Sequence, residues 1–120
     1  MALTTKTFFF GDAIILRCVG RLVAGQDTAA FRQGIEKLLS ERLKVVINLT
    51  EVDHIDSTGL AALVNLLAQK RDVENGARLV SAGMYLPGLL RRTKLDTVIT
   101  VYASEEVAVA SFLKRQASSG

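Results

Sequence analysis

Short apolar runs alternate along this chain with segments whose apolar residues recur at helical spacing. Phe8 to Phe10, the turn Gly11-Asp12 and the apolar run 13–19 have the turn chemistry and branched residues of a β-hairpin. A loop over 20–26 follows. Further short runs rich in branched residues predict strands over 44–49, 78–82 and 98–102. The segment 50–56 is a predicted loop, a second loop should open at Gly83, and Ala77 is predicted to be part of a turn.

The segments between these runs favour helices. The first is predicted from Asp27, a good N-cap residue, to Ser40. Its predicted apolar face comprises Ala30, Phe31, Ile35, Leu38 and Leu39. A second helix is predicted where apolar residues repeat at i, i+3, i+4 and i+7, namely Leu60, Leu63, Val64 and Leu67.

The predicted ends of the helices rest on residues that start or stop a helix. Asn75-Gly76 should stop the second helix, and Pro87 suits the first turn of a third helix that runs to about Thr93. Ser104 should cap a last helix that continues to about Lys114, with two glutamates in its first turn.

This order of elements, β, β, α, β, α, β, α, β, α, predicts an α/β fold. Parallel strands need crossover helices, so we expect a mostly parallel sheet of four to five strands with about four helices. The opening hairpin adds an antiparallel edge. We expect one domain over 1–115, followed by a flexible C-terminal tail over 116–120, where the residues are small and polar.

Composition narrows the classes of protein that fit. The chain is 49% hydrophobic and 22% charged, with a net charge of +3. This is the balance of a globular domain, and its basic residues are too dispersed to favour direct nucleic-acid binding. No leader signature and no apolar run near the roughly 20 residues of a membrane span is present, so we expect a cytoplasmic protein without a membrane segment. The single cysteine, Cys18, lies in an apolar run and is predicted to be a buried, inert thiol.

The segment from Asp53 to Leu60 stands out as a candidate site. It follows a predicted buried strand and opens an apolar helix, the place where α/β sheets carry function. Ser57 or Thr58 is the natural N-cap of that helix. A plain capping role is one interpretation of Ser57. A regulatory phosphate is the other, because a helix N-terminus attracts anions and the neighbouring Asp56 would push the phosphate outward, toward a docking partner.

Enzymatic and metal-binding interpretations fit this segment poorly. Ser57 and His54 lack the glycines of a nucleophile elbow, and His54 is the only histidine. Asp53 and Asp56 with one histidine form too sparse a ligand set for zinc or calcium. No phosphate-binding glycine loop occurs. We therefore expect no catalytic residue, no metal site and no cofactor.

At this segment the chain resembles the STAS family, named for sulfate transporters and anti-sigma factor antagonists. The resemblance lies in Val46-Ile47-Asn48-Leu49, Val52 and Ile55-Asp56-Ser57-Thr58-Gly59-Leu60, which match the family pattern of a strand, a short loop and Asp-Ser-Ser/Thr-Gly-Leu at a helix start. It extends to Val19-Gly20-Arg21-Leu22 with Asp27, to the segment 76–83, and to Leu89–Leu95 with Val98-Ile99.

The resemblance implies an anti-sigma factor antagonist, a switch protein and not an enzyme. Its unphosphorylated form would bind an anti-sigma factor that is also a serine kinase, which would phosphorylate Ser57 and so be released; a serine phosphatase would reset the switch. The implied partner-binding residues are Arg21, Asp27, Asp56, Ser57, Thr58 and Gly59. Thr58 stays open as the acceptor. The alternative is a STAS scaffold or regulatory subunit of a larger complex, stressosome-like or lipid-transporting, without a phosphoswitch.

Overall fold

The computed structural model describes residues 3–68 and 76–112. Its elements are β1 (Leu3–Phe10), β2 (Ala13–Leu22), α1 (Gln26–Ser40), β3 (Lys44–Ile55), α2 (Ser57–Ala68), β4 (Gly76–Val80), α3 (Tyr85–Arg92), β5 (Val101–Tyr102) and α4 (Glu105–Ala110). The order of strands and helices is the predicted one.

The strands form one sheet in the order β1-β2-β3-β4-β5. β1 and β2 pair as an antiparallel hairpin, whereas β2, β3, β4 and β5 are parallel to one another. Each parallel connection contains a helix, as a crossover between parallel strands requires. The predicted fold class, a mostly parallel α/β sheet with an N-terminal antiparallel hairpin, is confirmed.

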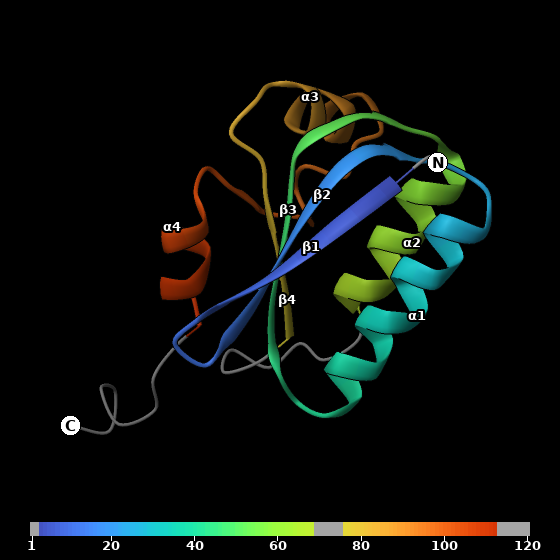
Figure 1. The fold of residues 1–120 in the computed structure, drawn as a ribbon. Coiled ribbons are helices and arrows are strands. Elements are labelled where there is room, and N and C mark those ends of the chain that lie inside the picture. Colours follow the sequence, from blue (N-terminus) through green and yellow to red (C-terminus); the bar gives the residue numbers. More distant parts are fainter. Residues whose placement is uncertain (1–2, 69–75, 113–120) are drawn as a thin grey trace.

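The helices cover the two faces of the sheet unequally. α1 and α2 lie side by side on one face and α4 lies on the other, as Figure 1 shows. The larger core lies under α1 and α2. A smaller core lies under α4 and consists of Ile15, Val46, Val80, Ala108 and Phe112. Because side chains alternate across a strand, the uninterrupted run Val45-Val46-Ile47, fully buried, supplies both cores.

Three strands are longer than predicted. β1 begins at Leu3, since its threonines pair with β2 although they are exposed. β3 runs to Ile55, so the predicted loop over 50–56 is wrong for all but its last residue. β2 continues to Leu22 and pairs with β3 up to Leu22↔Ile55, with register shifts that the sequence pattern does not reveal. Tertiary pairing thus extends strands through polar segments.

The two later strands also differ from expectation. β4 begins at Gly76 and includes Ala77, so the predicted turn at Ala77 is wrong: Gly76 and Ala77 pair with Lys44 and Val45 of the parallel strand β3. β5 shrinks from the predicted 98–102 to two residues, and Val98 is 74% exposed. Residues 98 and 99 instead donate their N–H groups to the carbonyl of Leu95 in a turn.

Two predicted helix faces need correction. α1 begins at Gln26, and Asp27 is not its N-cap but accepts a hydrogen bond from the backbone N–H of Leu3 at 3.3 Å. Ala30 is exposed, and Thr28 is buried in its place. In α2 the inner face holds Leu66, while Val64 is 36% exposed.

The remaining predictions concern the last two helices, Cys18 and the C-terminal end. α3 spans Tyr85–Arg92 as expected, and Ser104 caps α4 by accepting from the N–H of Val107 at 3.2 Å. Cys18 is 2% exposed, and its burial raises the pKa of the thiol to about 12, so it is an inert core residue. The last helix is shorter than predicted, because α4 ends at Ala110 with Ser111 as its C-cap and does not continue toward Lys114. The predicted helix stop at Asn75 and the tail over 116–120 lie outside the described residues.

Candidate functional site

The site lies where β3 ends and α2 begins, beside the end of β2. Its capping residue is Asp56, not Ser57 or Thr58 as predicted. The carbonyl of Asp56 accepts from the N–H of Leu60 at 2.9 Å, and its Oδ1 accepts from the N–H of Gly59 at 2.8 Å. This is the geometry of a helix N-cap, and a carboxylate also suits the positive end of the helix.

Asp56 also ties α2 to the segment between β2 and α1. Its Oδ2 accepts from the N–H of Ala24 at 2.9 Å, and its own N–H donates to the carbonyl of Leu22 at 3.2 Å. One carboxylate therefore fixes two segments that are 32 residues apart in sequence. These contacts lie on backbone atoms of Leu22 and Ala24, which explains why no side-chain pattern pointed to them.

These hydrogen bonds lower the pKa of Asp56. The N–H of Ala24 contributes most, followed by that of Gly59, because both stabilise the ionised carboxylate. A lowered pKa in the folded state means that the stabilisation is present above the unfolded pKa near 4 and is lost as the pH falls through the folded value.

We predict that Asp56→Asn weakens the acid dependence of stability. Asparagine keeps an acceptor for Gly59 but cannot accept from both N–H groups, so the variant is less stable at pH 7 and its unfolding free energy falls less below about pH 4. Urea titrations at several pH values measure this. Asp53→Asn, which removes an exposed carboxylate from β3, is the control. If the unfolding free energies of wild type and Asp56→Asn fell equally as the pH is lowered, the role assigned to the Asp56 carboxylate would be contradicted.

Gly59 lets α2 approach β2 closely. A Cβ at this position would overlap the carbonyl oxygen of Leu22 and lie 2.8 Å from its carbonyl carbon. The same carbonyl accepts from the N–H of Asp56. The glycine is therefore required by the contact that positions the start of α2, and its role is packing and not partner recognition alone.

Ser57 and Thr58 occupy the first two positions of α2 and are both exposed. Since Asp56 already uses the first-turn N–H of Gly59, a phosphate on Ser57 would lie beside an occupied cap. Thr58 lines a groove of about 430 Å³ between α1 and α2, together with Gly25, Thr28, Ala29, Arg32, Ala61, Ala62 and Asn65.

The two remaining predicted site residues come from β2 and α1. Arg21 is exposed within β2, opposite His54 in the register with β3, and not in a loop. Asp27 contacts the N-terminal strand through Leu3. The structure thus joins Asp56 and Gly59 to the end of β2 and the segment that follows it, and places Ser57 and Thr58 beside this junction.

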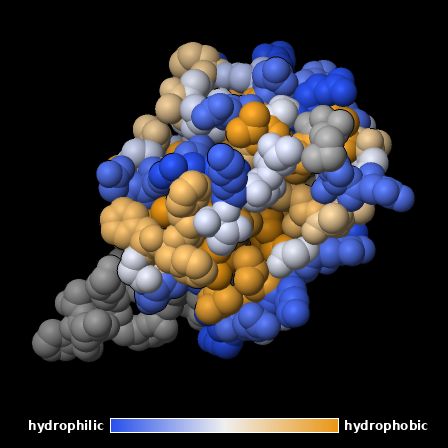
Figure 2. Space-filling model, viewed as in Figure 1, coloured by the Kyte–Doolittle hydropathy of each residue, from blue (hydrophilic) through white to orange (hydrophobic). Residues whose placement is uncertain are grey.

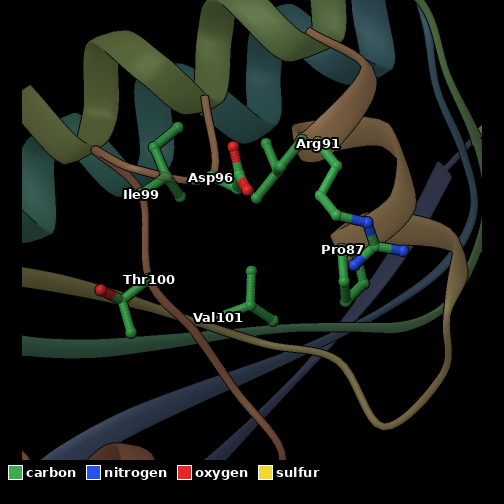
Figure 3. Close-up of a pocket in the computed structure, with 7 residues that line it drawn as sticks. Pro87, Arg91, Asp96, Ile99, Thr100 and Val101 are labelled. Atoms are coloured by element: carbon green, nitrogen blue, oxygen red, sulfur yellow. The ribbon is translucent and has the colours of Figure 1, made fainter. Parts of the chain in front are cut away.

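The structure also contains cavities away from this site. One of about 310 Å³ lies between α3 and the segment before β5 and is lined by Pro87, Leu90, Arg91, Asp96, Ile99, Thr100 and Val101. The Arg91 guanidinium points toward Pro87 and away from Asp96 (Figure 3). Over residues 3–68 and 76–112, no cluster of three or more His, Cys, Asp or Glu side chains could hold a metal ion, and no helix has the length and apolarity to cross a membrane.

Comparison with solved structures identifies proteins that share this fold. An anti-sigma factor antagonist from Mycobacterium paratuberculosis superposes with a TM-score of 0.74 at 22% identity, covering 92% of this chain and 94% of that one. SpoIIAA, an anti-sigma factor antagonist solved in its unphosphorylated form, gives 0.68 at 15% identity, covering 88% and 93%. A sulfate transporter family protein from Wolinella succinogenes gives 0.68 at 20% identity, covering 86% of each chain.

Sequence comparison reaches the same family. No curated protein sequence matches the chain. The family model of the STAS domain matches residues 7–108, which include every strand from β2 to β5 and the whole of the site around Asp56. The match spans most of the 120 residues. The chain belongs to the STAS domain family.

Proposed function

We propose that this protein is an anti-sigma factor antagonist that binds an anti-sigma serine kinase while Ser57 is unphosphorylated and releases it once Ser57 carries a phosphate. The observation that carries the proposal is the exposed Ser57 at the first position of α2, directly after the capping Asp56, in a STAS domain. A serine phosphatase would reverse the modification. The protein would act in the cytoplasm and have no catalytic activity.

Two kinds of support stand behind this proposal. The fold neighbour SpoIIAA, named an anti-sigma factor antagonist, has been solved in an unphosphorylated and a phosphorylated form. In the present chain the capping carboxylate leaves the backbone geometry of the helix start independent of the Ser57 hydroxyl. A phosphate could therefore be added or removed without refolding, and its charge of about −1.5 to −2 would act on the docking surface.

The sharpest test is partner capture with matched baits. Wild type and Ser57→Ala should retain a serine kinase from the native lysate, whereas Ser57→Asp should lose it by at least about tenfold, because a carboxylate buried in an interface that was built around a neutral hydroxyl is costly to desolvate. Thr58→Asp distinguishes the two candidate acceptors. Incubation of the wild type with the captured kinase and ATP, followed by mapping of the phosphorylated residue, completes the assignment.

The result also decides the second candidate function. A STAS scaffold or regulatory subunit is favoured by the transporter-family neighbour of the same fold. It predicts that all four baits retain the same complex. Equal retention of one set of proteins by wild type and Ser57→Asp, with the mutant folded as judged by circular dichroism, would reject the phosphoswitch.

A further inference from the structure

β1 is an exposed edge of the sheet. All of its residues except Leu3 are exposed, and its pairing with β2 runs over eight consecutive residues without a register shift. It contains no proline, and its end nearest the turn is Phe8-Phe9-Phe10. Edges are normally kept short or irregular, as β5 is at the other side of the sheet with only two residues. A long, regular edge indicates a pairing partner.

The phenylalanines project from both faces of this strand. Phe8, which stacks under the guanidinium of Arg17 at 4.3 Å, and Phe10 share a face, while Phe9 is on the opposite face and 76% exposed. Figure 2 shows apolar surface at the turn end of β1. A partner seated on one face of the sheet would cover only part of this set. A strand added to the edge would flank all three.

The backbone of β1 offers a defined set of outward groups. The two-residue turn makes Phe10↔Ala13 a hydrogen-bonded pair, and such pairs alternate along a hairpin. The N–H and C=O groups of Thr5, Thr7 and Phe9 therefore point away from β2. The N–H of Leu3 also points outward, and it donates to Asp27.

We propose that β1 pairs antiparallel with β1 of a second copy of this chain, with the two-fold axis at Thr7. In this register Thr7 faces Thr7 of the second copy, and Thr5 of each copy faces Phe9 of the other. All three outward residues then lie in hydrogen-bonded pairs. A shift by one residue would place side chains on the wrong faces, so only registers centred on a residue of the strand are allowed.

Neighbouring registers between the two β1 strands are less favourable, because they bring like charges together or leave hydrogen-bonding groups unpaired. Centring on Lys6 sets two lysines directly opposite each other in a close pair, which is repulsive. Centring on Phe8 leaves Thr5 without a partner. Centring on Thr7 puts the Lys6 ammonium opposite the ring of Phe8 of the second copy, a favourable cation–π arrangement, and places Thr4 against Phe10. The strand is complementary to itself in this register.

The mass of the protein in solution tests the proposal. We expect light scattering after size exclusion to give twice the 13.0 kDa of one chain, falling toward 13.0 kDa on dilution. Thr7→Lys places like charges at the two-fold axis and should shift the dimer to monomer. Thr7→Val, which keeps the β-branched shape without charge, should retain it. A wild type of 13.0 kDa at every concentration up to about 1 mM would overturn the proposal.

A cross-link fixes the register. In a hydrogen-bonded antiparallel pair the Cα atoms lie about 5.5 Å apart, within the usual range for a disulfide. Thr7→Cys should therefore form a covalent dimer on mild oxidation, whereas Thr5→Cys should not, since its nearest counterpart is Phe9. Cys18 is buried and does not interfere. Cross-linking through Thr5→Cys but not Thr7→Cys would refute this register, and neither outcome depends on the Ser57 phosphoswitch.

Discussion

Replacing Gly59 with alanine is expected to destabilise the domain by about 3 kcal/mol or more. The added methyl group would overlap the carbonyl oxygen of Leu22, and a backbone atom cannot rotate away as a side chain can. Either α2 moves outward, which breaks the contacts of Asp56 with Leu22 and Ala24, or β2 bends. Urea denaturation monitored by circular dichroism measures the loss as a lower midpoint with an unchanged slope.

Gly34 provides a matched control for this experiment. It lies within α1, and a Cβ there would meet nothing within 4 Å. Gly34→Ala should therefore stabilise the protein by about 0.5–1 kcal/mol, since glycine is costly in a helix. If Gly59→Ala and Gly34→Ala shifted the midpoint in the same direction, the close approach of α2 to Leu22 would not be what requires glycine at 59.

Phe112→Ala is expected to cost about 3–5 kcal/mol. Phe112 is 1% exposed and is the largest side chain of the core under α4, packed with Ile15, Val46 and Val80. The guanidinium of Arg78 lies 4.0 Å from the centre of its ring. Removing the ring leaves a cavity over the sheet and detaches the end of α4. Global stability is measured by urea denaturation.

Amide hydrogen exchange shows which elements lose stability in Phe112→Ala. The amides of α4 should exchange faster in Phe112→Ala, together with those of β4, while Phe112→Leu should lose less than about 1.5 kcal/mol because it keeps most of the apolar volume. Unchanged protection of α4 in Phe112→Ala would show that the Arg17–Glu105 and Asn48–Glu105 contacts, at 2.8 Å each, hold this helix without the ring.

Periodicity alone was enough to predict the element order and the fold class. Val45-Val46-Ile47 predicted a strand buried on both faces, and the i, i+3, i+4, i+7 pattern predicted the helix that follows it. These signals are strong because each element buries a fixed geometric set of side chains. The STAS resemblance likewise rested on contiguous residues, and the family match over residues 7–108 confirms it.

Polar segments gave weaker predictions. The extension of β3 through residues 50–55 has no apolar period of its own and follows from pairing with β2. The same holds for the threonines of β1, which are exposed and form a strand because β2 supplies hydrogen bonds. Strand ends of this kind depend on partners distant in sequence, and local propensity does not contain that information.

The sequence by itself determined that four of the six predicted site residues lie together: Asp56, Ser57, Thr58 and Gly59 are contiguous, so any fold keeps them close, unlike Arg21 and Asp27. Only the tertiary structure decided their separate roles. Asp56 became the cap because its carboxylate reaches both Gly59 and Ala24, and Ser57 was thereby left exposed. Gly59 is needed because the Leu22 carbonyl arrives there from β2. A carbonyl or an N–H is present at nearly every position, so only the path of the folded chain can show which one a side chain will meet.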